Sequence, residues 1–243
     1  MKLVLLADTH IPFHIHLDPV FEFIKDFKPD KIILVGDMHD WTAVSHWTAE
    51  NSRHLDGGII QENYDELKKE LLNPLKKIKG KAEMIYILGN HEDWLIQATN
   101  ESPNGRGYWE IEKNIDCLEY DMKLVAVNKV YRVNSKLYIT HGPYTNEFHA
   151  KKMVNTYHTT ILYGHVHDIQ SHTIVSAVDV DEFYNGQSIG CLCHLNPHYM
   201  KNRPNRWVNG FCFVYVDDKT GYFNHYPVFI VKNKFWANGR NYA

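Results

Sequence analysis

Short apolar runs alternate with polar segments along the whole chain, which is 243 residues long. Nine of these runs are rich in β-branched or aromatic residues and have the length of β-strands. The pattern predicts strands at residues 3–7, 32–35, 84–88, 137–140, 160–163, 172–178, 187–191, 211–216 and 222–230.

Two segments between the first three predicted strands have the spacing of amphipathic helices. Residues 20–27 carry apolar side chains at helical intervals and stop before Pro29. Residues 60–78 continue the same spacing over five turns and end at Gly80, which favours a helix terminus. Pro74 lies inside the second helix and is expected to bend or break it.

The order of these elements predicts an α/β fold. Strand and helix alternate in the first half, which favours parallel strands with crossover helices, whereas the second half is nearly all strand. We therefore expect two packed sheets with helices outside, in a single domain over residues 1–243. Loop insertions are expected near residues 41–58, 99–119 and 194–207.

Composition and charge narrow the function classes. Apolar residues make up 44% and charged residues 23% of the chain, as in globular proteins. The formal net charge of −3 excludes a global basic field, so any binding to nucleic acid must be local. No apolar run is long enough for a membrane span, and we expect a cytoplasmic protein without a membrane partner.

The four cysteines form no C-x-x-C pair, and we expect all of them to be reduced. Cys191 and Cys193 flank Leu192, so their side chains would share one face if this segment is extended.

Polar residues that can bind metals follow five of the predicted strands. In open α/β sheets, functional groups gather beyond the carboxyl ends of the strands. A single Gly-Asp or Gly-Asn pair there is usually a turn, but five such ends in one chain favour a site. These segments read DTH (8–10), GDMHD (36–40), GNHE (89–92), HG (141–142) and GHVH (164–167).

The five blocks, in this order, resemble the signature of the calcineurin-like metallophosphoesterases: D-x-H, G-D-x-x-D, G-N-H-(D/E), a histidine and G-H-x-H. They span residues 8–167, about two thirds of the chain. The resemblance implies a two-sheet αββα sandwich of the metallophosphoesterase type. It also implies a metal-dependent phosphoric ester hydrolase.

Oxygen and nitrogen donors without thiolates favour borderline divalent cations, with Mn²⁺ the expected ion and Fe²⁺, Zn²⁺ or Ni²⁺ as alternatives. The resemblance implies two such ions as cofactors. The implied ligands are Asp8, His10 and His167 at the first ion, Asn90, His141 and His165 at the second, and Asp37 as the bridge.

The same resemblance implies roles for three residues of the second and third blocks. His91 would protonate the leaving oxygen, Asp40 would orient His91, and Glu92 would give local support. The implied reaction is hydrolysis of a phosphate ester by a hydroxide that bridges the two ions.

The substrate class rests on weaker signals. The second block continues as Trp41-Thr42, whereas protein phosphatases of this superfamily continue with Arg-Gly, which disfavours a phosphoprotein substrate. Three rim stretches, 41–58, 102–109 and 194–207, combine basic and aromatic residues, the pattern that holds phosphates and stacks bases. The expected substrate-binding residues are Arg106, Arg203, Arg206 and Trp207, beside further rim residues Trp47, Arg53 and Tyr199.

Several alternatives stay open. Trp41, Trp47 and Trp207 can equally be packing residues. A phosphodiesterase or nuclease-like enzyme on a nucleotide or nucleic acid is preferred over a phosphomonoesterase on small molecules or phosphoprotein. The alternative from another class is a non-catalytic scaffold that retains the fold. The sequence does not determine the oligomeric state.

Overall fold

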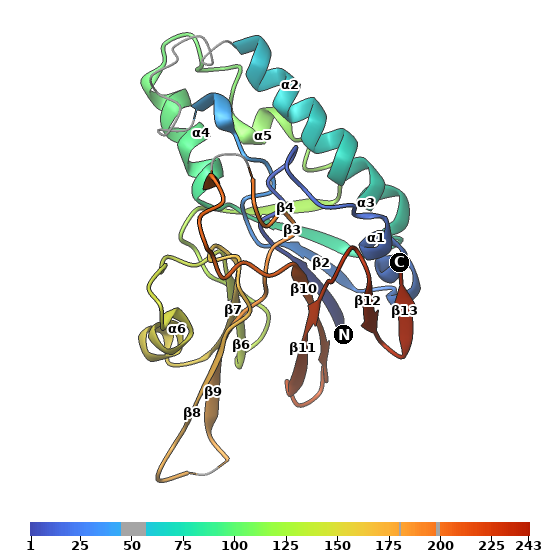
Figure 1. Cartoon of the computed structure of the whole chain (residues 1–243), viewed down its shortest axis with the longest axis vertical. Helices are drawn as coiled ribbons and strands as arrows, with labels where there is room; N and C mark the ends of the chain where they lie inside the picture. Colours follow the sequence, from blue (N-terminus) through green and yellow to red (C-terminus); the bar gives the residue numbers. More distant parts are fainter. Residues whose placement is uncertain (45–56, 180, 198–199) are drawn as a thin grey trace.

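The computed structural model describes residues 1–44, 57–179, 181–197 and 200–243. Two β-sheets pack face to face, with a thick helical layer on one side and helix α6 on the other (Figure 1). The predicted α/β class and αββα sandwich are confirmed.

The larger sheet has the strand order β11-β10-β1-β2-β3-β4, in which β1 to β4 run parallel and β10 is antiparallel to β1. Its members are β1 (Lys2–Leu6), β2 (Lys31–Leu34), β3 (Glu83–Ile87), β4 (Met122–Val125), β10 (Gly210–Val216) and β11 (Phe223–Phe229).

The second sheet has the order β5-β6-β7-β9-β8, with β6, β7 and β9 parallel. Its members are β5 (Tyr131–Arg132), β6 (Leu137–Thr140), β7 (Thr160–Tyr163), β8 (Ser171–Val175) and β9 (Phe183–Ser188). A small separate hairpin, β12 (Phe235–Ala237) and β13 (Arg240–Tyr242), covers helix α1 (Asp18–Phe27).

One apolar layer joins the two sheets. Leu5, Ile33 and Ile85 project from the first sheet, and Ile139 and Leu162 project from the second. All five side chains are fully buried. Strands β1, β2, β3 and β10 of the first sheet are buried on both faces, which is why they read as continuous apolar runs rather than alternating ones.

The outer face of the first sheet packs against the long helical layer. These helices are α1, α2 (Gly57–Leu67), α3 (Asn73–Ile78), α4 (Asn90–Glu101) and α5 (Ile111–Asn114), with a short 3₁₀ turn at Thr42–Val44. Helix α6 (His149–Tyr157) covers the second sheet alone. Within the described part of the chain, no helix is long and apolar enough to cross a membrane.

The helix predicted over residues 60–78 does not break at Pro74. A π-helical turn at Lys68–Leu72 joins α2 to α3, and there the N–H of Asn73 donates to the carbonyl of Lys68, five residues earlier. Pro74 then occupies the first turn of α3, where its missing N–H costs least.

The strand expected at 187–191 is displaced, because β9 covers Phe183–Ser188 instead. This strand is polar and yet buried in its second half. Its Asn185 amide donates to the hydroxyls of Ser171 and Thr173. A Cβ atom at Gly186 would lie 2.4 Å from the Ala150 carbonyl oxygen, so this glycine lets α6 approach the sheet. The hydrophobic pattern could not reveal such a strand.

Candidate metal centre

Five loops meet at one rim of the sandwich, each following the carboxyl end of β1, β2, β3, β6 or β7. The seven residues expected to bind metals come together there from segments that lie far apart in the sequence. They are Asp8, His10, Asp37, Asn90, His141, His165 and His167.

The first group consists of Asp8, His10 and His167, whose ligand atoms all lie within 4.8 Å of one another. His167 Nε2 lies 3.3 Å from Asp8 Oδ1 and 3.1 Å from His10 Nε2. Two imidazole nitrogens at this separation cannot both carry a proton without repulsion. Together with the Asp8 carboxylate, the two nitrogens form a donor set suited to one cation.

The second group consists of Asp37, His141 and His165, again within 4.8 Å. His141 Nδ1 donates to the Val35 carbonyl oxygen at 2.8 Å. Its Nε2 therefore faces Asp37 Oδ2 at 3.2 Å and Asn90 Oδ1 at 3.0 Å. A lone pair cannot face two oxygen acceptors without repulsion, so this nitrogen needs either a second proton or a cation.

Asp37 lies between the two groups. Its Oδ2 is 3.2 Å from His141 Nε2 and 3.9 Å from His10 Nε2, one imidazole from each group. Its Oδ1 accepts the main-chain N–H of His91 at 2.9 Å. This is the position of a carboxylate that can serve two cations.

The electrostatics of the cluster follow from these contacts. Burial lowers the pKa of His141, but the charge of Asp37 and its hydrogen bond outweigh burial and raise the pKa to about 10. Burial also lowers the pKa of His10, but the Asp40 hydrogen bond and the Asp37 charge outweigh burial and raise this pKa to about 9. For His165, burial and the neighbouring His141 charge lower the pKa to about 4. Protons on His10 and His141 thus occupy the positions that cations would take, and the residues present fit two divalent ions.

The main chain turns sharply at these ligands. Asp8, His10, Asp37, His165 and His167 have φ of +51°, +48°, +55°, +71° and +60°. For residues with a side chain, this left-handed conformation costs on the order of 1–2 kcal/mol each. Such outliers gather at functional sites, where surrounding contacts hold them.

Glycines make room for the ligands. A Cβ atom at Gly36 would lie 2.3 Å from His141 Nδ1, and one at Gly89 would lie 2.2 Å from Asp37 Oδ1. A Cβ atom at Gly164, in the GHVH block, would lie 2.4 Å from Asp8 Oδ2. Each of these three glycines, Gly36, Gly89 and Gly164, therefore leaves space for a ligand that belongs to a different block.

Glu92 does more than the local support expected from the sequence. Its carboxylate is fully buried and accepts the main-chain N–H groups of Asp37 (2.9 Å), Met38 (3.1 Å) and Gly89 (2.8 Å). The hydroxyl of Tyr86 donates to it at 2.7 Å. One side chain thus ties the loop after β2 to the loop after β3.

His91 is oriented through the main chain of Asp40. Its Nδ1–H donates to the Asp40 carbonyl oxygen at 2.6 Å, and its Nε2 lies 4.0 Å from Asp37 Oδ2. The Asp40 carboxylate instead lies closest to His10, at 2.9 Å, and is 3.6 Å from His91 Nδ1. Asp40 therefore positions two imidazoles, one with its side chain and one with its carbonyl. The His91 ring packs on Trp94, with centroids 3.9 Å apart.

A pocket of about 290 Å³ adjoins the cluster on the side of His165. Arg206 and Trp207, two of the residues that the sequence analysis expects to bind substrate, both line it. Arg206 forms an ion pair with Glu147 at 2.8 Å, and the Trp207 ring lies 4.2 Å from the ring of His167.

Other rim residues lie elsewhere. Arg106 is exposed and donates to the Asn100 carbonyl at 2.8 Å, and Arg203 is exposed as well; neither is among the described residues that line the pocket. Trp41 is buried against Tyr64, with centroids 4.9 Å apart, so it is a packing residue. Three further residues lie outside the described part of the chain: Trp47, Arg53 and Tyr199.

Sequence reasoning missed the polar wall of the pocket. His149 Nε2 lies 3.0 Å from Asp168 Oδ2, and the hydroxyl of Ser188 donates to Asp168 Oδ1 at 2.8 Å. Asp168 directly follows the GHVH block, a position that could have signalled it. His149 lies on α6, a helix that the hydrophobic pattern did not predict.

Comparisons with known proteins find a matching family model and several similar proteins. A model of the calcineurin-like phosphoesterase superfamily domain matches residues 1–197. The gene 54 protein of Mycobacterium phage L5 is 23% identical over 255 residues, covering 98% of this chain and 97% of that protein. Its counterpart in Mycobacterium phage D29 is 25% identical over 233 residues, covering 89% of each. Among solved structures, Vps29 of Entamoeba histolytica complexed with zinc is 10% identical with a TM-score of 0.49, covering 97% of this chain and 96% of that one.

We expect Glu92→Gln to lower the free energy of unfolding more than Tyr86→Phe does. Tyr86→Phe removes one hydrogen bond to a charged acceptor, which costs about 1.5–3 kcal/mol. Glu92→Gln leaves buried N–H groups facing an amide that cannot accept from all of them. Urea unfolding followed by circular dichroism measures both values. A Glu92→Gln chain as stable as the parent would contradict this role.

Divalent metal should displace protons at neutral pH. The pKa values of about 9 and about 10 mean that His10 and His141 are protonated at pH 7, and each must lose a proton before its nitrogen can bind an ion. Affinity for Mn²⁺ should therefore rise with pH and level off above about pH 10. Isothermal titration calorimetry at pH 7, in buffers of different ionisation enthalpy, counts the protons released. A count of zero would disprove the expectation.

Proposed function

The chain belongs to the calcineurin-like phosphoesterase superfamily, and from this premise we propose that it hydrolyses a phosphodiester in a nucleotide or nucleic acid. Two divalent cations would be its cofactors. The observation that carries the proposal is the pair of donor groups that share Asp37 and lie beside a pocket lined by Arg206 and Trp207.

Each donor group would hold one cation, with Asp37 serving both. When bound, divalent ions at such a site supply charge neutralisation on the phosphoryl oxygens and lower the pKa of water. The residues that would hold them are Asp8, His10 and His167 on one side and Asn90, His141 and His165 on the other.

His91 is the residue best placed to move a proton. Its Nδ1 is committed to the Asp40 carbonyl, so Nε2 is the atom that faces Asp37 and the centre of the cluster. Burial and the charge of His10 lower the pKa of His91, despite the opposing charge of Asp37. A bound phosphate brings negative charge that favours the protonated ring, which then transfers its Nε2 proton to the leaving oxygen.

The pocket supports a substrate with more than an isolated phosphate group. Arg206 is exposed at the pocket wall, where a phosphate oxygen can replace Glu147 as the partner of its guanidinium. Trp207 offers an aromatic ring beside His167, on which a base can stack. The small volume also suits a compact phosphomonoester, which is the alternative substrate.

The choice between these substrates can be tested with two chromogenic esters. With Mn²⁺ present, kcat/KM should be higher for bis-p-nitrophenyl phosphate than for p-nitrophenyl phosphate, and Asp37→Asn should abolish turnover of both. A preference for the monoester would defeat the diesterase proposal. Turnover of neither ester by a metal-loaded chain would instead support the scaffold alternative.

The His91→Ala substitution should slow hydrolysis by an amount that depends on the acidity of the leaving group. Without its proton donor, hydrolysis of a diester with an alkyl leaving group should slow by roughly 10²–10⁴-fold. Hydrolysis of the p-nitrophenyl diester should change far less, because p-nitrophenolate leaves unprotonated. The matched control is His16→Ala on the exposed surface, which should leave both rates unchanged. Equal losses on the two esters would rule out the general-acid role.

A further inference from the structure

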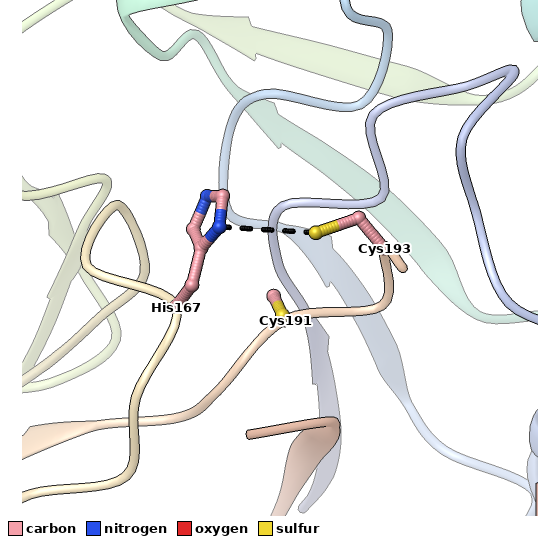
Figure 2. A group of neighbouring side chains, drawn as sticks. All are labelled: His167, Cys191 and Cys193. Atoms are coloured by element: carbon pink, nitrogen blue, oxygen red, sulfur yellow. Dashed lines mark hydrogen bonds between the residues drawn. The ribbon is translucent and has the colours of Figure 1, made fainter. Parts of the chain in front are cut away.

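A second set of donors adjoins His167 on the side away from Asp8. The Sγ atoms of Cys191 and Cys193 and one imidazole nitrogen of His167 all lie within 4.8 Å of one another. Figure 2 shows both sulfur atoms on the same side of the imidazole, carried by one loop. All three side chains are buried. We name these three residues the thiol cluster.

His167 has two different edges. Its Nε2 faces the carboxylate of Asp8 at 3.3 Å, whereas its Nδ1 faces Cys193 Sγ at 3.8 Å. By contrast, the Nδ1 atoms of the other two imidazoles face oxygen atoms. His10 Nδ1 lies 2.9 Å from Asp40 Oδ1, and His141 Nδ1 lies 2.8 Å from the Val35 carbonyl oxygen. An oxygen partner is the usual arrangement for a histidine that binds a metal. His167 departs from this arrangement because its Nδ1 faces a thiol, so the role of this thiol needs a separate explanation.

The main chain holds the two thiols in place without a ligand. The N–H of Cys191 donates to the Val208 carbonyl at 3.1 Å. The Asn209 amide donates to the Cys193 carbonyl at 2.6 Å and lies 3.8 Å from Cys191 Sγ. Leu192 between them belongs to the large hydrophobic cluster on the outer face of the first sheet. Isolated β-bridges to Asn209 and His14 flank the two cysteines, so the donors are preorganised, which lowers the cost of binding an ion.

We propose that the thiol cluster is a binding site for a thiophilic divalent cation, with Zn²⁺ as the first case. Around a tetrahedral zinc ion, bonds of about 2.3 Å to sulfur and about 2.0 Å to nitrogen put these two atoms roughly 3.6 Å apart. Cys193 Sγ and His167 Nδ1 are already 3.8 Å apart. Two sulfur donors favour Zn²⁺ more strongly than Mn²⁺, the ion expected at the oxygen and nitrogen donors around Asp37.

Charge balance also favours a divalent ion in this buried place. Binding converts both thiols to thiolates and releases two protons, so that the two negative charges offset the charge of Zn²⁺. A neutral complex avoids the large cost of an unpaired buried charge. If a cation also occupies the Nε2 side, the His167 imidazole loses its remaining proton and bridges the two ions.

Cobalt(II) provides the test, because it accepts the same ligands as Zn²⁺ and absorbs in the near ultraviolet when bound to thiolate. The full-length, reduced and metal-free chain is titrated with Co²⁺. We expect a sulfur-to-cobalt charge-transfer band and three bound ions per chain. The double variant C191S/C193S should lose the band and one ion. As the matched control, Cys117→Ser alters a thiol outside the cluster and should keep both.

Two results would overturn the proposal: a parent chain saturated with Co²⁺ that shows no thiolate band, or a band that survives in C191S/C193S. If the double variant does not fold, X-ray absorption of the zinc-loaded parent chain decides the question without a substitution. Sulfur neighbours of zinc support the site, because the described ligands around Asp37 are all oxygen or nitrogen. Neither readout depends on turnover, so a chain with the thiolate band that cleaves no phosphoester would contradict the proposed function alone.

Discussion

The buried carboxylate of Glu92 is the constraint on which the geometry of the rim depends. It fixes the main chain at Asp37 and at Gly89, so the loops that carry the shared carboxylate and the Asn90 amide keep one relative position. A charged acceptor among several N–H donors is stable in a dry interior, because every hydrogen bond it lost to water is replaced. The position of each donor then follows from the strand that precedes it.

Stability and chemistry oppose each other at this rim. Five ligands adopt left-handed backbone conformations, and like charges collect on His10 and His141 in a buried place. The apolar layer between the sheets and the Glu92 network hold this arrangement together. A bound cation would replace the repelling protons by coordination bonds, and these bonds would offset the cost of the strained loops.

The sequence predicted those features that are encoded by neighbouring residues. Each ligand block follows its own strand directly, so the order of strands was enough to expect Asp8, Asp37 and His141 at one rim, where the structure brings them together. Contacts between loops that lie far apart in the sequence could not be predicted from it. The approach of Cys193 to His167 depends on how the loop after β9 returns to the rim, and strand β9 itself was hidden by its polar residues.

The block glycines make the five motifs dependent on one another during evolution. Gly36 and Gly89 lack a side chain, and the space that a side chain would fill is occupied by His141 and Asp37, respectively. If a descendant lost His141, the reason to keep Gly36 small would weaken at the same time. Decay of the site in a lineage should therefore be visible as paired changes, in which a glycine enlarges in one block after a ligand disappears from another.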